Sequence, residues 1–499
     1  MKEKKEKEQM INNYKSLKGN AILNGIRQIV VLLAPLLVVT YVTRIIGPDN
    51  YGRLSYASHF VSYFTLLSSF GISSYAIREG SAIKKDKEKC EKLYGEIFGF
   101  NIISTIFSLL SLSLILVLSQ KVKDYGLLIV IYACSIPFNT FSFEWIFHIY
   151  EDFKYVTIRT IVIEIIQVIL VFVLVRSPSD TYLYAIIGLC TSILIGVSNL
   201  FSSRRYCKFL PIINRGLLKH LKNIFIMFAC ELSIVIYVSS DVMILGNCCS
   251  DEEVGLYSLA ANIYIILKKL IYSVGVVSLP RVTAYLSKGE MDKYNKCARN
   301  VIDAILVALI PAMVGLFSIS GNAIYIVSGP EYLGATNTLR ILSVAMFFAV
   351  MSSILTSVVI LPHKYEKYLL LATVSSAALN IILNLILIPY YGIEAAACTT
   401  LFSELVAFMI LLIVSYKNAK LRVFGSFKNS VSLIVGAIPI YFICLVVNIL
   451  VPNNVWINTA LAVTISIIIY FGILFLMKNE VLIDATASLI HKIRRKGNE

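Results

Sequence analysis

The chain has 499 residues, of which 58% are hydrophobic and 15% are charged, and its mean hydropathy is +0.78. Soluble globular proteins carry about 25% charged residues, so this composition excludes a soluble globular protein and indicates a chain embedded in a bilayer. The net charge of +15 does not indicate nucleic-acid binding, because the basic residues gather in alternate loops between apolar stretches.

Apolar stretches of roughly 20 residues recur along the whole chain, the length that an α-helix needs to cross about 30 Å of hydrocarbon. No alternation of short strands indicates a barrel, so we predict an all-α polytopic membrane protein. About fourteen transmembrane helices are expected. Their approximate ranges are 20–45, 53–77, 93–119, 125–149, 156–176, 181–203, 223–246, 254–278, 300–320, 338–361, 368–389, 393–415, 431–451 and 456–477.

A tandem repeat organises these helices. Four residues recur in an identical form 203 positions later: Gly52, Ser55, Ala57 and Arg78 match Gly255, Ser258, Ala260 and Arg281. Such repeats are typical of secondary transporters. The repeat predicts three parts: an N-terminal lobe of six helices (1–215), a C-terminal lobe of six helices (216–416), and two additional helices with a basic tail (417–499).

The distribution of basic residues among the loops predicts the membrane topology. Lys and Arg concentrate before the first helix and in the segments 84–92, 204–222, 288–296, 417–428 and 492–496, all of which fall on one side of the membrane in the helix order above. The opposite loops are poor in Lys and Arg. By the positive-inside rule, both termini are expected in the cytoplasm.

Charged residues inside predicted helices are candidates for function, because each costs roughly 2.5–3.5 kcal/mol at the bilayer centre on insertion scales. Cations suit an anionic headgroup such as a pyrophosphate, since Arg offers a fork and Lys a point charge. The candidate substrate-binding cations are Arg27, Arg53, Arg159, Lys268 and Lys269. The candidate ion-coupling carboxylates are Glu144, Glu164, Glu231 and Asp303.

The alternative for each of these residues is an interhelical salt bridge or a side chain that snorkels to the interface. Arg53 lies near a predicted helix end, which favours that alternative. Arg27, Lys268 and Lys269 lie deeper in their helices, which favours a cavity.

No motif indicates a catalytic residue, a metal or a cofactor. The ten cysteines are scattered, with no CxxC pair, and no Gly-rich phosphate loop is present, so ATP is not expected as the direct energy source. We therefore expect a protein that is not an enzyme and that uses at most H⁺ or Na⁺ for coupling.

Local motifs add a family resemblance. The stretch Tyr41–Gly52, which reads YVTRIIGPDNYG, together with Phe70–Ile72 and Ala76–Glu79, closely resembles the start of bacterial polysaccharide flippases of the Wzx type. These belong to the polysaccharide transporter family of the MOP superfamily. The resemblance extends over essentially the whole chain, including the turn PYYGIEAAA at Pro389–Ala397.

The resemblance implies two six-helix lobes in a V shape that work by alternating access, as in MATE antiporters. It also implies a bacterial cytoplasmic membrane protein that carries an undecaprenyl-pyrophosphate-linked oligosaccharide across the bilayer for O-antigen, capsule or a related polymer. The implied partners are this lipid-linked substrate, membrane lipids, and a polysaccharide polymerase and glycosyltransferases; nucleic acid is not among them. The lipid II flippase uses cations on its first, second and eighth helices, and Arg27, Arg53 and Lys268/Lys269 lie on comparable helices.

Three other functions remain open at this point. A MATE-like multidrug exporter would favour an acidic, aromatic cavity. An oligosaccharide polymerase would be expected to carry large outer loops with catalytic residues, and the outer loops here are short. A scaffold that binds partners through its basic loops is the third, although membrane topology already explains those loops.

Overall fold

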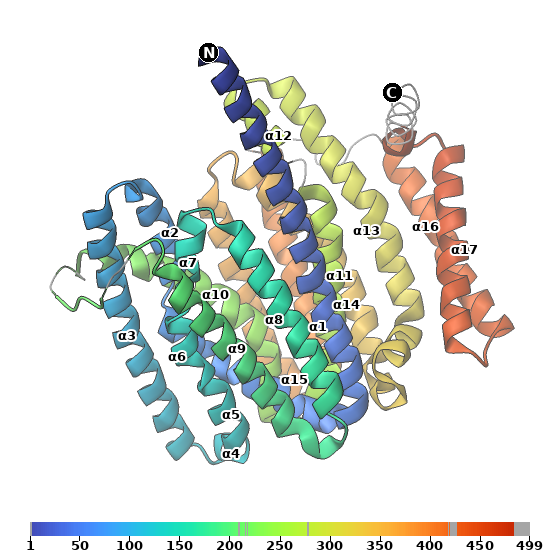
Figure 1. The fold of residues 1–499 in the computed structure, drawn as a ribbon. Coiled ribbons are helices and arrows are strands. Elements are labelled where there is room, and N and C mark those ends of the chain that lie inside the picture. The colour runs from blue at the N-terminus through green and yellow to red at the C-terminus, as the bar shows by residue number, and fades with distance from the viewer. Residues whose placement is uncertain are drawn as a thin grey trace. The chain divides into compact units, whose positions relative to one another are not determined.

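The computed structural model describes residues 2–207, 210–214, 216, 218–276, 279–417, 419 and 427–483; the side chains of residues 2–29 and of several other helical positions are outside this description. The described residues form helices and no strand, which confirms the all-α prediction (Figure 1). The chain divides into two compact units, Met1–Met243 and Ile244–Glu499. The three-part division predicted from the repeat stays a prediction.

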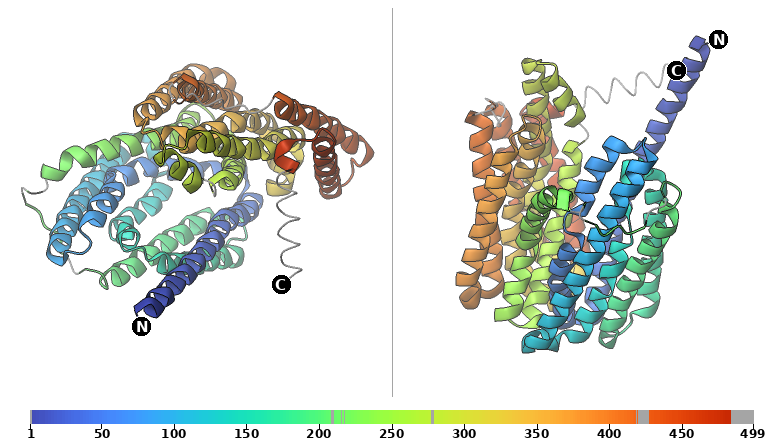
Figure 2. Two further views of the ribbon diagram at one scale, coloured as in Figure 1. Left: turned by 90° about the horizontal axis from the view of Figure 1, so that it is seen from above. Right: turned by 90° about the vertical axis from the view of Figure 1, so that its left-hand side faces the viewer.

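The first unit is built on a long N-terminal helix. Within it, α1 packs against α3 and α8, and α8 packs against α9 (Figure 2). Its helices are α1 (Lys2–Ser69), α2 (Ile72–Ile83), α3 (Lys87–Leu118), α4 (Gln120–Asp124), α5 (Gly126–Ala133), α6 (Ser135–Thr140), α7 (Glu144–Ile149), α8 (Phe153–Leu174), α9 (Thr181–Ser203) and most of α10 (Leu218–Cys248).

The second unit is centred on α14, which packs against α11, α13 and α15, while α16 packs against α17 and α13. Its helices are α11 (Asp251–Val276), α12 (Leu279–Ser287), α13 (Met291–Ser328), α14 (Thr336–Leu355), α15 (Glu366–Lys417), α16 (Phe427–Leu450) and α17 (Val455–Leu476).

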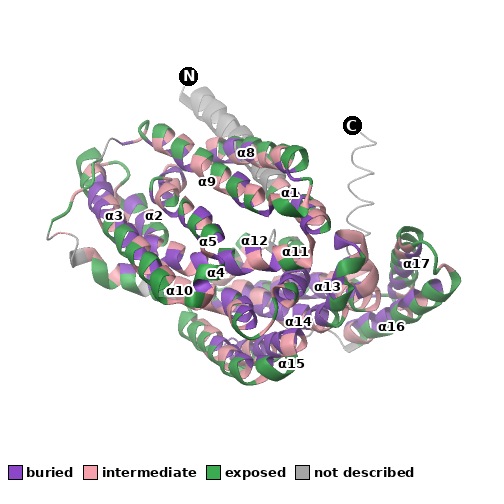
Figure 3. Cartoon of the chain, turned by 90° about the horizontal axis from the view of Figure 1, so that it is seen from below, coloured by how far each residue is buried: buried purple, intermediate pink, exposed green. Residues whose placement is uncertain are grey.

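Many of these helices are suited to a membrane. Within the described residues, ten are long and apolar enough to cross one, or eleven if the two bent parts of α10 form one span. Large apolar side chains also cover the outside of the helices: Leu110, Leu118 and Leu476 are 65%, 73% and 81% exposed. Figure 3 shows exposed positions in green on many helices, α3, α16 and α17 among them. An apolar exterior of this extent fits lipid, so the chain is a multi-pass membrane protein.

Two of the described helices, α1 and α15, are more than twice as long as one crossing requires. α15 has 52 residues, which corresponds to about 78 Å along a helix axis and exceeds the bilayer core of about 30 Å more than twofold. It is broken at Gly392 (φ 55°), and α1 is broken at Gly47 (φ 77°). The apolar runs of the sequence predict helix boundaries at both places, and glycine suits such breaks because it adopts a positive φ without a steric penalty. The number of fourteen crossings stays a prediction.

One predicted helix was wrong. The sequence predicted a single helix over 125–149, whereas the structure has three short helices there, α5, α6 and α7. Pro137 has no amide hydrogen to donate to the carbonyl of Ala133, and α5 ends at that residue. Phe143 adopts a left-handed conformation (φ 44°) and separates α6 from α7.

Candidate functional site

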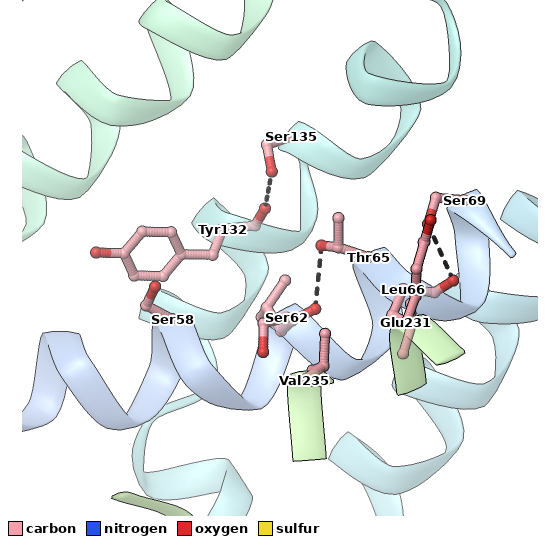
Figure 4. A pocket seen from close by; sticks show the side chains of 10 residues that line it. Ser58, Ser62, Thr65, Leu66, Ser69, Tyr132, Ser135, Glu231 and Val235 are labelled. Carbon is pink, nitrogen blue, oxygen red and sulfur yellow. Dashed lines mark hydrogen bonds between the residues drawn. The ribbon is translucent and has the colours of Figure 1, made fainter. Parts of the chain in front are cut away.

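The first unit contains a cavity of about 480 Å³, and six of its ten lining residues carry a hydroxyl group (Figure 4). We call it the hydroxyl cavity. Its walls come from the second part of α1, from α5 and α6, and from α10. The lining residues are Ser58, Val61, Ser62, Thr65, Leu66, Ser69, Tyr132, Ser135, Glu231 and Val235.

The sequence of α1 explains why its hydroxyls meet in this cavity. Ser58, Ser62, Thr65 and Ser69 are spaced i, i+4, i+7 and i+11, so they lie on one face of the helix. The segment after Gly47 is helical through Ser69, which keeps the four positions in register. A polar stripe thus runs along one side of α1 for about 16 Å.

The hydroxyls of this stripe are predisposed to accept hydrogen bonds. Ser62 donates to the carbonyl of His59 at 2.6 Å, Thr65 to that of Val61 at 3.1 Å, and Ser69 to that of Leu66 at 3.2 Å. A hydroxyl has one hydrogen to donate and two lone pairs. Because Thr65 and Ser69 direct their hydrogens to the backbone, their oxygen lone pairs remain to accept hydrogen bonds from a bound molecule, while the Oγ of Ser62 also lies 3.3 Å from that of Ser239.

Glu231 on α10 is the charged residue among the described residues that line the hydroxyl cavity. Its Oε1 accepts a hydrogen bond from the hydroxyl of Ser74 at 3.2 Å. A carboxylate offers about four lone-pair sites, so this single bond leaves acceptor capacity. The cavity therefore combines neutral and ionised acceptors, which suits a ligand that presents many O–H donors.

Buried hydrogen bonds hold α1 in place around the cavity. On one side of the helix, the hydroxyls of Ser68, Thr105 and Thr140 bond one another at 2.6–3.1 Å and join α1 to α3 and α6. Near the cavity, Ser239 on α10 lies 3.0 Å from the ring Nδ1 of His59. Polar contacts between helices inside a membrane fix helix positions, and these fix the direction of the hydroxyl stripe.

Arg159 and Glu144, two of the predicted site residues, lie together in the first unit. Arg159 on α8 is buried, and its Nη2 is 3.5 Å from Oε1 of Glu144 on α7. Its Nη1 donates to Oδ1 of Asn199 on α9. Arg159 therefore links α7, α8 and α9. This is the arrangement expected if Arg159 forms an interhelical salt bridge rather than part of a binding site.

Lys268 on α11 has a carboxylate partner in the second unit. Its Nζ is 3.6 Å from Oε1 of Glu404 on α15 and 5.0 Å from the ring centroid of Tyr264. The hydroxyl of Tyr264 donates to the same carboxylate at 3.1 Å. Lys269, the next residue, is exposed.

The other predicted residues are dispersed. Arg53 donates to the backbone carbonyl of Asp124 at 3.4 Å, near the end of the first unit formed by α4. Glu164 is half-buried on α8, and Asp303 is buried on α13. Arg27 lies in α1, but its side chain is outside the described residues. A substrate-binding or ion-coupling role for each predicted residue stays a prediction.

Two features of the sites were missed by sequence reasoning. The hydroxyl stripe has a helical spacing that is visible in the sequence, but Ser and Thr are common in membrane helices, so this spacing alone does not indicate a site. Glu404 is a carboxylate inside a predicted helix. Because a charged side chain inside the membrane costs free energy, its presence there would have identified it as a candidate.

Comparisons with known proteins agree with this architecture. The model of a family described as polysaccharide biosynthesis protein matches residues 17–286, more than half of the chain. A putative O-antigen transporter of Escherichia coli K12 is 23% identical over 419 residues, which cover 83% of this chain and 100% of that protein. A probable low-salt glycan biosynthesis flippase of Haloferax volcanii is 31% identical over 173 residues, covering 34% of this chain and 35% of that protein.

Two solved structures share the fold. The lipid II flippase MurJ in an inward closed conformation matches with a TM-score of 0.73 at 19% identity, over 93% of this chain and 99% of that one. An inward-facing multidrug resistance MATE family transporter of the MOP superfamily matches with a TM-score of 0.58 at 13% identity, over 76% and 92%. At these identities the likeness concerns the fold alone.

Proposed function

The chain belongs to the family of polysaccharide biosynthesis proteins, and on this premise we propose that it is a flippase for a lipid-linked oligosaccharide. The substrate is an oligosaccharide on undecaprenyl pyrophosphate, which moves from the cytoplasmic to the outer leaflet for the synthesis of O-antigen, capsule or a related surface polymer. The protein lies in the bacterial cytoplasmic membrane with both termini in the cytoplasm. A polysaccharide polymerase and glycosyltransferases act on the same substrate.

The hydroxyl cavity is the observation that carries this proposal. Sugars present many O–H donors, and the cavity presents the oxygen atoms of Ser58, Ser62 and Thr65 together with the carboxylate of Glu231. Its volume of about 480 Å³ lies within the common range for small-ligand sites, about 300–1,000 Å³. One or two sugar rings at a time would therefore exchange hydrogen bonds with water for hydrogen bonds with this surface.

The mechanism must move a polar headgroup through hydrocarbon, where an unpaired ionised group is very expensive. In the proposed cycle the lipid tail stays in the bilayer, and the headgroup crosses inside the protein as the two lobes predicted from the repeat rock. Arg27, Arg53, Arg159, Lys268 and Lys269 are the proposed cations for the pyrophosphate. H⁺ or Na⁺ binding at Glu144, Glu164, Glu231 or Asp303 would bias the direction.

A multidrug or cation antiporter is the second candidate, and one observation favours it. Among the described residues that line the hydroxyl cavity, Glu231 is a carboxylate and none is a cation. Organic cations prefer such a site. The two functions predict different effects of Glu231→Gln. The amide oxygen still accepts hydrogen bonds from sugars, so a flippase keeps flipping its lipid when no ion gradient is applied, whereas an exporter loses its counter-charge and its transport.

The test is transport by the purified full chain in liposomes, with an undecaprenyl-pyrophosphate-linked oligosaccharide in one arm and a fluorescent organic cation in the other. We expect the wild type to flip the oligosaccharide lipid and not to move the cation. Flipping that persists in Glu231→Gln supports the flippase. Cation efflux that Glu231→Gln abolishes, without flipping of the lipid, would replace it with the exporter.

A further inference from the structure

A second cavity in the first unit, of about 560 Å³, lies between α8 and α9. We call it the α8–α9 groove. One end is formed where α8 begins and α9 ends, at Lys154 and Arg205, and the groove continues along α8 to Ile166. Membrane helices leave the hydrocarbon at such ends, so the groove runs from the interface into the apolar layer.

The interfacial end of the groove carries an excess of positive charge. Lys154 and Arg205 are exposed, and neither has an ion pair within the part of the chain that the structure describes. The side chain of Arg159 is only 6% exposed, and its Nε has no hydrogen-bond partner there. Glu144, 3.5 Å from the Nη2 of Arg159, balances part of this charge from behind the groove.

The carboxylate that lines this end, Asp152, is already hydrogen-bonded. Its Oδ1 accepts from the backbone N–H of Tyr155 at 3.2 Å, which caps α8, and its Oδ2 accepts from the hydroxyl of Tyr206. The three cations are thus not neutralised by Asp152 alone. A phosphate oxygen at this end would receive charge-assisted hydrogen bonds from Arg and Lys.

The rest of the groove is apolar and open to the outside. Ile158, Val162 and Ile166 are spaced i, i+4 and i+8 on α8 and are 48%, 49% and 39% exposed. They form a strip about 12 Å long. Leu194 on α9, 44% exposed, provides the opposite wall.

We propose that the α8–α9 groove binds one anionic phospholipid. Lys154, Arg159 and Arg205 hold its phosphate, and an acyl chain lies along the apolar strip. The change from cationic to apolar lining along one groove matches the polarity of such a lipid from head to tail. A soluble phosphate would leave the strip unoccupied, and a zwitterionic lipid would gain less from the excess cations. This site is separate from the hydroxyl cavity, and it shares Arg159 with the set of cations proposed for the pyrophosphate.

Native mass spectrometry of the purified full chain, titrated with phosphatidylglycerol or phosphatidylcholine, tests the headgroup. We expect tighter retention of one phosphatidylglycerol, and we expect Arg205→Gln to weaken it about fivefold, the effect of one basic residue beside anionic lipid. Arg204→Gln is the matched control, because Arg204 does not line the groove and lies over the ring of Phe201 at 5.4 Å. Equal retention of the two lipids, or equal losses in both variants, would overturn the proposal.

The tail is tested by filling the strip. Val162→Trp should reduce phosphatidylglycerol retention without a change in charge, whereas Val173→Trp, at a position on α8 that is 51% exposed but outside the groove, should leave it unchanged. Soluble glycerol phosphate should compete only weakly. If it competes as well as the lipid, or if Val162→Trp has no effect, the groove is a phosphate site and the lipid assignment is wrong.

Discussion

At the scale of single residues, the structure distinguishes cations with partners from cations that face a cavity. Lys268 was predicted as a substrate-binding cation because it lies deep in its helix. In the second unit its side chain is 27% exposed and is paired with Glu404, whose side chain is 10% exposed. A half-buried pair of this kind is a structural contact first, and its role in substrate binding requires a separate test.

We predict that Glu404→Gln and Lys268→Met each destabilise the protein by about 1–3 kcal/mol, because each leaves the other charge partly buried without its partner. The double variant should recover part of the loss. Thermal unfolding in detergent measures this, with Lys269→Met, a change at an exposed neighbour, as the control.

The same variants separate structure from transport. If Lys268→Met is as stable as the wild type but does not transport, the lysine acts on the substrate and the ion pair contributes little. If stability and transport decline together and the double variant restores both, Lys268 acts by stabilising the fold.

At the scale of helices, Gly71 determines how α1 joins α2 in the first unit. Its φ of 70° is in the left-handed region, and a Cβ at this position would lie 2.6 Å from the backbone nitrogen of Phe228 and 2.8 Å from the carbonyl carbon of Met227 on α10. The close approach of two backbones therefore depends on the missing side chain. Phe70, the preceding residue, stacks on the ring of Phe228 with centroids 4.1 Å apart.

We predict that Gly71→Ala destabilises the protein by about 2 kcal/mol or more, because it adds both a strained φ and a steric clash with α10. Gly188→Ala on α9 is the matched control, since a Cβ there would meet no atom within 4 Å. It should change stability by no more than about 1 kcal/mol. An equal loss of thermal stability in the two variants would show that the contact with α10 is not responsible.

Helix positions were predictable where they depend only on the local sequence. Hydropathy located the long helices and also the breaks in α1 and α15, which the structure places at Gly47 and Gly392. The division of 125–149 was missed because the apolar run continues through Pro137 and because the left-handed conformation of Phe143 has no glycine to mark it.

The candidate sites were less predictable, because they depend on tertiary contacts. Arg159 and Glu144 were both identified, but their mutual contact and the bond from Arg159 to Asn199 link three separate helices. The hydroxyl stripe of α1 was present in the sequence, yet only the packing of α5, α6 and α10 around it makes a cavity.

At the scale of the whole molecule, the chain is a multi-pass helical protein whose fold is similar to that of the lipid II flippase MurJ, and its two units each contain polar residues within long apolar helices. The first unit contributes an acceptor-rich cavity, and the second contributes the pair of Lys268 and Glu404. The central claim is that the hydroxyl cavity receives the sugars of the transported lipid.

The measurement that tests this claim most directly is the rate of oligosaccharide-lipid flipping by Ser62→Ala/Thr65→Val in liposomes, compared with the wild type and with Thr191→Val. Thr191 on α9 donates to the carbonyl of Ile187 at 3.0 Å, as Thr65 does to that of Val61, but does not line the cavity. Each lost hydrogen bond to a sugar is expected to cost about 1 kcal/mol, so the double variant should be roughly tenfold or more slower while Thr191→Val is unchanged. Wild-type rates in a well-folded double variant would contradict the assignment of the cavity to the sugar headgroup.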